Sequence, residues 1–364
     1  MTLLPSLFGT RPRALLGVDI GSSAVKVLQL GRRGRGYGVE ACAVEPMPAN
    51  AVADDGQIPD PERVADVVRR AVARAGTGVR DVALAMPTTL VIDKRINLAA
   101  GLREADMEEQ IRAEADQHIS FPLAEVDLDF TRLGRAPGDD TSAEVLLVAC
   151  RKEHVEARVV AAEIAGLHVR VVDVETYALA GASEILRDQL PDFGVGHTVA
   201  VIDLGAATLS MLVLHNGVWA YSHDQTFGGQ QLTGEIARVC GVTPEEAEKI
   251  KCGEALPEAV TAEVLPRFYD DFAQQIQRAM QYYYANPGTA RDAVIDVIIL
   301  AGGSARIPHL AEAVTERLKL PVQPAEPFRS MPMATRVRGK QVQADGPALL
   351  VAAGLALRAF DEPD

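Results

Sequence analysis

Two stretches of this chain share one strand–turn–strand pattern, and this duplication constrains the fold more than any other feature. The first is LLGVDIGSSAVKVLQL at residues 15–30, and the second is VAVIDLGAATLSMLVL at residues 199–214. They superpose without a gap, so that Asp19 corresponds to Asp203, 184 residues later. A spacing of this size is that of a whole domain rather than of a short tandem repeat, so the pattern predicts two related lobes.

Each copy is a β-branched apolar strand that ends in an aspartate and a glycine-containing turn, after which an alternating strand begins. Such a turn points successive backbone N–H groups into one concavity, where phosphate oxygens are bound without side-chain bulk. An aspartate beside those phosphates would repel them unless Mg²⁺ and its water ligands lay between. A single copy is better explained as an ordinary hairpin with an Asx-bonded aspartate, but two aligned copies favour a phosphate site. Lys26 either contacts a phosphate or is a solvated strand lysine.

Length and charge limit the class of protein. At 364 residues the chain suits two packed halves, and its 48% hydrophobic and 24% charged residues are typical of a globular protein. The formal net charge of −14 disfavours nonspecific binding to nucleic acid or anionic lipid, although a local basic site is compatible with it. We therefore expect no nucleic-acid partner.

The cysteines and the apolar runs indicate the compartment. The chain has four scattered cysteines, Cys42, Cys150, Cys240 and Cys252. Because they form neither a CxxC pair nor a Cys/His cluster, they predict a reducing compartment and no structural zinc. The most apolar runs, residues 198–214 and 294–300, are interrupted by a charge or too short to span a bilayer. Residues 1–13 lack the charge order of a secretory signal, which favours a flexible lead-in over a weak membrane-surface anchor.

Two further segments supply groups for a nucleotide. Residues 294–318 predict a buried strand, a Gly302–Gly303–Ser304 turn on which a base or ribose would rest, and an amphipathic helix from near Pro308. Thr243 and the Pro-Glu-Glu after it predict a helix N-terminus, and Glu248 and Lys251 then share one helix face. That pair is either a solvent-exposed ion pair, worth under about 1 kcal/mol, or a clamp on ribose and adenine. Rossmann and P-loop sites are excluded because their glycine motifs are absent from the sequence.

The region between the first hairpin and the second lobe predicts a small inserted α/β module. Residues 103–118 are acidic and helix-favouring and stop at Phe121-Pro122, and strands are predicted at residues 126–133 and 144–149. The apolar residues of the first of these strands indicate a binding or packing surface.

Two phosphate turns, an AEKIK helix and an AGG turn, in this order, resemble the nucleotide-site motifs shared by actin, heat-shock-70 chaperones, sugar kinases and bacterial FtsA. Within that superfamily, AMPTTLVIDKRI and GLREADMEEQIRAEADQHISFPLAEVDLDFTRLG at residues 85–134, with AGLHVRVVDVETYALA at residues 165–180, are similar to the PilM family of type IV pilus inner-membrane platform proteins. The resemblance covers nearly the whole chain. It implies an α/β, actin-like fold in which two lobes repeat a ribonuclease-H-like architecture, with an FtsA-type insertion called 1C.

The resemblance also implies how the chain is divided. Lobe 1 would contain subdomain 1A at residues 13–87, the 1C-like insertion at 88–164, and a return to 1A with an interlobe helix at 165–196. Lobe 2 would contain subdomain 2A at residues 197–228, subdomain 2B at 229–292 and a return to 2A at 293–342. A C-terminal helix within residues 343–361 would pack back on lobe 1.

By the same resemblance, ATP or ADP lies between the lobes, and Asp19 and Asp203 hold Mg²⁺ through water. The implied phosphate contacts are Gly21, Ser22, Ser23 and Lys26 from lobe 1 and Gly205, Ala206 and Thr208 from lobe 2. The implied ribose and base contacts are Glu248, Lys251, Gly302, Gly303, Ser304 and Ile307. DLGAAT has alanine where many superfamily members have another glycine, which favours binding over turnover. Glu175 is the one candidate for positioning the attacking water, and at most slow hydrolysis is expected.

The predicted function is that of a cytoplasmic adaptor in which ATP fixes the angle between the lobes. In the family, subdomain 1C contributes to a groove for the cytoplasmic N-terminal peptide of the membrane protein PilN, so membrane association would be indirect, and other pilus machinery proteins are further partners. A sugar or acetate kinase is one alternative, although no segment supplies its polar substrate pocket. An FtsA-like polymerising filament is the other. The tail at residues 358–364 is acidic and predicts no FtsA-like membrane tether.

Overall fold

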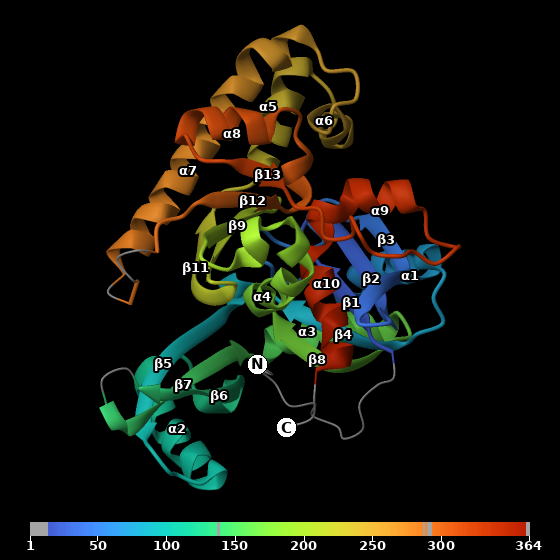
Figure 1. The fold of residues 1–364 in the computed structure, drawn as a ribbon. Coiled ribbons are helices and arrows are strands. Elements are labelled where there is room, and N and C mark those ends of the chain that lie inside the picture. Colours follow the sequence, from blue (N-terminus) through green and yellow to red (C-terminus); the bar gives the residue numbers. More distant parts are fainter. Residues whose placement is uncertain (1–13, 137–138, 287, 290–292, 362–364) are drawn as a thin grey trace.

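The computed structural model describes residues 14–136, 139–286, 288–289 and 293–361. The expected lead-in at residues 1–13 and the last three residues of the acidic tail lie outside these ranges. The described chain contains two five-stranded sheets with helices on their faces and a separate three-stranded sheet (Figure 1). Within these ranges, no helix is both long enough and apolar enough to cross a bilayer.

The first sheet consists, in spatial order, of β3 (Gly36–Pro46), β2 (Ala24–Arg33), β1 (Leu16–Ile20), β4 (Asp81–Met86) and β8 (His168–Val174). The strand β1 pairs antiparallel with β2 and parallel with β4. All five residues of β1 are buried, because helices cover both faces of the sheet at its centre.

The second sheet repeats this plan with β11 (Val218–Thr226), β10 (Thr208–His215), β9 (Thr198–Leu204), β12 (Val297–Ala301) and β13 (Val322–Pro324). Here β9 pairs antiparallel with β10 and parallel with β12, as β1 does with β2 and β4. Asp19 lies in β1 and Asp203 in β9, each at the end of its central strand. The predicted duplication of two lobes is therefore confirmed.

Helices cover the outer faces of both sheets. The helices α1 (Pro61–Ala75) and α3 (Lys152–Ile164) pack on the first sheet. The first of them begins where Asp60 caps two backbone N–H groups and ends at Gly76, whose φ of 66° is the left-handed conformation that terminates helices. The second sheet is covered by α5 (Gly229–Cys240), α7 (Leu265–Ala285) and α8 (Leu310–Leu318).

Two helices, α4 (Glu175–Leu186) and α10 (Leu350–Leu357), lie between the sheets (Figure 1). Leu179 and Leu186 of α4 pack on the second sheet, whereas α10 packs on the first. The two helices touch backbone to backbone, since a Cβ added at Gly354 would overlap the carbonyl group of Ala178. This close contact fixes how the lobes meet.

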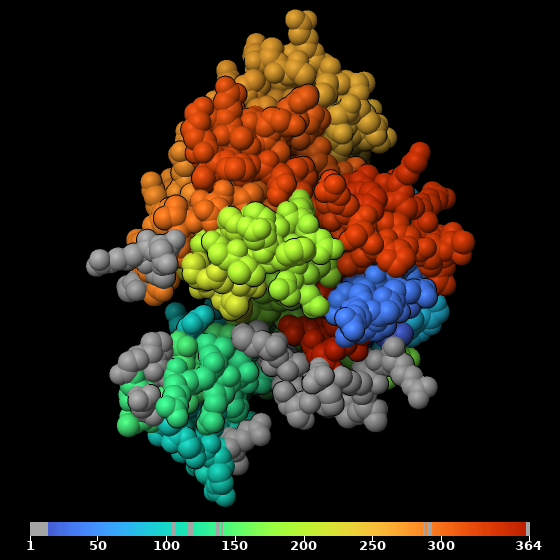
Figure 2. All heavy atoms as spheres, in the orientation of Figure 1, coloured from blue at the N-terminus to red at the C-terminus, as the bar shows by residue number. Residues whose placement is uncertain are grey.

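The three-stranded sheet is antiparallel and consists of β5 (Val91–Ala99), β7 (Asp139–Arg151) and β6 (Val126–Ala136). It buries its apolar side chains against α2 (Glu104–His118), in which Ile111 is fully buried. The chain enters this module after β4 and returns to the first sheet through α3 and β8. Figure 2 shows it as a protrusion from the two lobes. The predicted inserted α/β module is present, with longer strands than expected.

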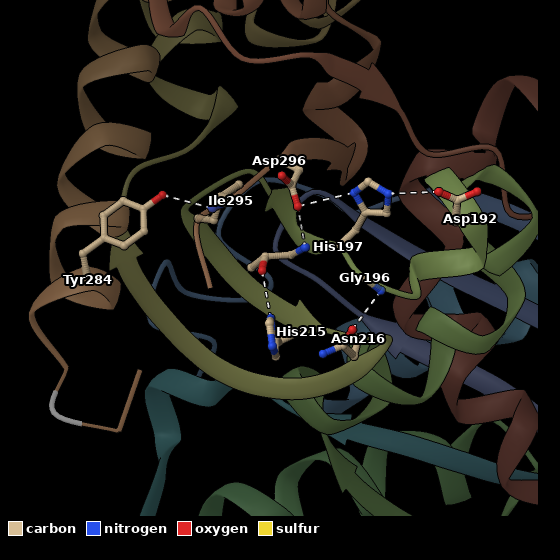
Figure 3. A network of polar contacts seen from close by, with 9 residues as sticks. Asp192, Gly196, His197, His215, Asn216, Tyr284, Ile295 and Asp296 are labelled. Atoms are coloured by element: carbon tan, nitrogen blue, oxygen red, sulfur yellow. Dashed lines mark hydrogen bonds and ion pairs between the residues drawn. The ribbon is translucent and has the colours of Figure 1, made fainter. Parts of the chain in front are cut away.

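A polar network holds the N-terminal end of β9 (Figure 3). The imidazole of His197 lies 3.3 Å from an Asp192 oxygen and 3.4 Å from an Asp296 oxygen. The backbone N–H of Thr198 donates to Asp296 at 2.7 Å, and the Thr198 hydroxyl lies 2.9 Å from Nδ1 of His215. None of the predicted nucleotide residues belongs to this network, which ties the start of β9 to Asp296, the residue directly before β12.

Candidate functional site

The first predicted phosphate turn lies at the end of β1. Asp19 and Lys26 face each other across the β1–β2 pair, and Nζ of Lys26 donates to Oδ2 of Asp19 at 2.8 Å. The turn is closed by Gly21 N–H donating to Ala24 O at 3.1 Å. Burial by itself lowers the pKa of Lys26, but nearby carboxylates, above all Asp19, outweigh it and raise that pKa. The interpretation of Lys26 as a solvated strand lysine is therefore wrong.

The second turn follows Asp203 and has the same geometry. Gly205 N–H donates to Thr208 O at 2.9 Å, which corresponds to the Gly21 bond of the first turn. The carbonyl of Gly205 accepts from Gly229 N–H at 3.0 Å and from the Ser304 hydroxyl at 3.1 Å. The second turn is thus fastened to the start of α5 and to the AGG turn.

The AGG turn follows β12 and lies directly beside Asp203. Gly302 has a φ of 88°, and a Cβ there would overlap Leu204 O and lie 2.6 Å from Oδ1 of Asp203. Only glycine fits this position, because both the conformation and the space exclude a side chain. Gly303 is exposed, whereas Ile307 is 4% exposed and packs in the core of the second lobe.

The fourth segment forms α6 (Pro244–Lys251), and the predicted N-terminus is confirmed by a capping box between Thr243 and Glu246. Lys251 is only 4% exposed, and its Nζ lies 2.6 Å from Oε2 of Glu248. The amine also donates to the Thr233 hydroxyl at 3.1 Å. The ion pair is therefore exposed on one side only, because the Glu248 side chain is 48% exposed whereas the lysine is buried at the start of α5.

The two hairpins and α4 bring a surplus of acidic groups together. Burial, with smaller contributions from neighbouring carboxylates, raises the pKa of Asp203 to about 6. Burial and the charge of Asp19 raise the pKa of Glu175, the first residue of α4, to about 8, although Arg158 and Lys26 act against this. In the ligand-free protein, burial therefore disfavours the charged forms of both carboxyls.

This donor set fits a hydrated Mg²⁺, because a nearby dication would favour the charged forms of these carboxyls and Mg²⁺ prefers carboxylate and water oxygens. Among the described residues, no three His, Cys, Asp or Glu side chains are grouped so that they alone would hold a metal. Asp19 and Asp203 would instead hold the ion through water, and the ion would neutralise phosphate charge there.

Sequence reasoning missed Arg158, Asp224 and the tight contact at Gly228. Arg158 lies on the buried face of α3 with Ala161 and Ala162. A charged residue among the apolar positions of a predicted helix could have marked it as a candidate functional residue. Asp224 on β11 has a pKa raised by burial and accepts a hydrogen bond from Ser210. A Cβ at Gly228 would overlap Ala206 O, so Gly228 is a second position at which only glycine allows the backbone of the second turn to come this close.

A groove of about 140 Å³ lies where the inserted module joins lobe 1. Its walls come from the starts of β5 and β6, the end of β7, the segment after α2, and α3. Phe121 is 40% exposed, and the guanidinium of Arg151 lies 5.1 Å from its ring centroid. The lining residues are Thr89, Leu90, Val91, Ile92, Ile119, Phe121, Val126, Ala149, Cys150, Arg151 and His154. The groove is mostly apolar, with cationic and imidazole groups at one side.

Two repeated lobes that meet around a pair of aspartate-bearing hairpins define a protein of the actin-like class. This agrees with the ethanolamine utilization protein EutJ from Carboxydothermus hydrogenoformans, which is similar in fold at a TM-score of 0.55 and 19% identity, with 98% of this chain and 91% of that chain covered. A chain from a structure described as a "PilM-PilN type IV pilus biogenesis complex" is similar at a TM-score of 0.79 and 26% identity, with 97% of this chain and 100% of that chain covered. The family model for type IV pilus assembly protein PilM matches residues 17–360, and the chain belongs to this family. The expected fold and family are both confirmed.

Proposed function

We propose that this protein is an ATP-binding, actin-like adaptor of the type IV pilus assembly platform that binds the cytoplasmic N-terminal peptide of PilN. The observation that carries the proposal is membership of the family over residues 17–360. It is supported by similarity over 97% of the chain to a protein from a complex with PilN. Association with the inner membrane would then be indirect, through PilN.

We propose that the three-stranded module corresponds to subdomain 1C and that the groove at its junction with lobe 1 receives the peptide. Leu90, Ile92 and Phe121 give the groove an apolar wall that would bury aliphatic side chains of the peptide. The remaining subdomain bounds follow from the sequence resemblance.

We further propose that Mg-ATP lies between the two hairpins, with the phosphates at both turns and the ribose and base between α6 and the AGG turn. Its support is the grouping of Asp19, Asp203 and Glu175, whose charges act on one another, together with the obligatory glycine at Gly302 and the buried Lys251. The second turn carries Ala206 and Ala207 where a glycine would allow closer approach, so we expect retention of nucleotide with slow hydrolysis at most.

Peptide binding is tested by fluorescence anisotropy with a labelled peptide that has the N-terminal cytoplasmic sequence of the cognate PilN. Phe121→Ala removes an apolar wall of the groove and should weaken binding at least about tenfold, since truncating an aromatic anchor typically costs 2 kcal/mol or more. Val239→Ala is the matched control, because Val239 is also 40% exposed but lies on α5. Absence of binding by the native protein at about 100 μM would refute the peptide proposal.

Nucleotide binding is tested by equilibrium dialysis with Mg-ATP. The double variant Asp19→Ala, Asp203→Ala should lose retention of Mg-ATP while its far-UV circular dichroism stays nearly unchanged. A collapsed spectrum would show that these carboxylates serve the fold instead. No retention of Mg-ATP by the native protein would refute the nucleotide proposal.

A further inference from the structure

Arg158 on α3 is a buried cation that the proposed function leaves unexplained. Its side chain is 1% exposed, and Nη2 donates to Gly56 O at 2.6 Å. The other two nitrogens, Nε and Nη1, are buried without a hydrogen-bond partner among the described residues. A buried donor without a partner is unfavourable, so a shift that gives Arg158 a second partner would stabilise the protein.

The charge of Arg158 acts on the nucleotide cleft. Burial lowers its pKa, and the carboxylates that oppose this include Glu175 and Asp19, which lie at the cleft. In return, Arg158 is the strongest of the cations that lower the pKa of Glu175. No carboxylate oxygen of the described residues lies within the 4 Å of a direct ion pair, so the guanidinium is close to the cleft without being locked to it.

The same helix also contributes to the groove. His154 lies one turn before Arg158 on α3, on the same helix face, and lines the groove. The loop held by Arg158 bonds to the groove as well, because the Thr89 hydroxyl donates to Asp55 O at 2.6 Å and Thr89 is a lining residue. Arg158 and Thr89 therefore grip adjacent carbonyls of one loop, those of Gly56 and Asp55.

The segment that lines the groove is bonded to the cleft through a second contact. The hydroxyl of Thr88 lies 2.8 Å from the hydroxyl of Thr176, in the first turn of α4. Thr176 follows Glu175 directly, so a single hydrogen bond joins the backbone beside Glu175 to the segment that contains Thr88 and Thr89.

We infer that Arg158, with the Thr88–Thr89 segment, is a positioning unit that links the nucleotide cleft to the peptide groove, so that Mg-ATP and the peptide each tighten the binding of the other. The inference rests on the proposed function of both sites. A ligand in either site orders the same loop and the same helix, so the second ligand meets a protein that is already ordered. Linkage requires the effect to be equal in both directions.

The test measures the dissociation constant of the labelled PilN peptide with the full chain, without nucleotide and with saturating Mg-ATP. We expect Mg-ATP to tighten peptide binding about tenfold, within the range usual for coupled sites. Arg158→Lys keeps the positive charge but loses the planar guanidinium. In this variant Mg-ATP should tighten peptide binding by less than about twofold. Each ligand alone should still bind within about threefold of its native affinity. Thr88→Val removes only the bond to Thr176 and should have the same effect.

Arg69→Lys is the matched control, because Arg69 also donates to a backbone carbonyl, that of Ile164 at the end of α3. This variant should leave the effect of Mg-ATP on peptide binding unchanged. The melting temperature is measured for each variant. If the native protein binds both ligands but Mg-ATP does not change its affinity for the peptide, the inference is overturned and the proposed function remains intact. Failure of either ligand to bind refutes the proposed function and the inference with it. If Mg-ATP tightens peptide binding by the native factor in both Thr88→Val and Arg158→Lys, the assignment of Arg158 and Thr88 as positioning residues is also overturned.

Discussion

Replacing Glu175 by glutamine should stabilise the ligand-free protein at alkaline pH and not at acidic pH. Glu175 has an ordinary pKa of 4.5 in the unfolded chain and a pKa of about 8 in the folded one. Because the folded state holds the proton more tightly, the contribution of Glu175 to stability is greatest below pH 4.5 and falls as the pH rises toward 8. The loss corresponds to at most about 5 kcal/mol, since each pH unit is worth about 1.4 kcal/mol.

Glutamine has nearly the same shape as glutamate and no charge, so the unfolding free energy of Glu175→Gln should not fall as the pH rises toward 8. We expect a gain in unfolding free energy of about 3–5 kcal/mol at pH 8.5 and of about 1 kcal/mol or less at pH 5. At about 2 °C per kcal/mol for a chain of this size, the melting temperature should rise by roughly 6–10 °C at pH 8.5. Melting is followed by circular dichroism in EDTA, without nucleotide.

Glu184→Gln is the control, because Glu184 is exposed on the same helix and should show no gain at either pH. An equal gain at pH 5 and pH 8.5 would mean that glutamine merely packs better. No gain at pH 8.5 would refute the claim that burial and Asp19 disfavour a charged Glu175 in the ligand-free protein.

Three other substitutions test separate contacts. Gly302→Ala should weaken Mg-ATP binding at least about tenfold in equilibrium dialysis and lower stability by about 1–3 kcal/mol, because the new Cβ would meet Leu204 O at a φ of 88°. Gly78→Ala, between α1 and β4 and with open space around it, should do neither. Lys251→Met should weaken nucleotide binding about tenfold, whereas Lys249→Met on the exposed side of α6 should not, and equal effects would exclude a specific clamp. Arg358→Met should cost about 3 kcal/mol in urea unfolding at pH 7, because it removes the bond of 2.6 Å to Asp173, which is 2% exposed; a change below about 0.5 kcal/mol would show that the C-terminal helix does not depend on this pair.

The parts of the fold that sequence predicts best are those with a local signal. The two hairpins were predictable because a buried strand, an aspartate and a turn glycine recur in fixed order around Asp19 and Asp203. The start of α6 was predictable because Thr243 and Glu246 satisfy each other's backbone groups within four residues. These features depend on neighbours in the chain and need no knowledge of the tertiary structure.

Features that depend on distant contacts were not predictable from local patterns. The burial of Lys251 results from the packing of α6 on α5, where Thr233 and the Gly229 carbonyl accept from its amine. The contact between Thr88 and Thr176 joins residues on opposite sides of the insertion. The roles of Arg158 and Asp224 depend on where α3 and β11 place them, which no short sequence window contains.

We expect the residues at the two hairpins to favour holding a nucleotide over hydrolysing it. The second turn is fastened to the start of α5, whose N–H groups donate to the carbonyls of Gly205 and Ala206, and its alanines lie at the proposed phosphate position. Glu175, the candidate for positioning the attacking water, is mostly protonated at neutral pH in the ligand-free protein because its pKa is about 8. A protonated carboxyl donates a hydrogen bond and cannot accept a proton from water. Hydrolysis through Glu175 would therefore need a bound cation to lower this pKa first, whereas binding of Mg-ATP would not need Glu175 to be charged. An adaptor that retains its ATP needs nucleotide binding and does not need turnover.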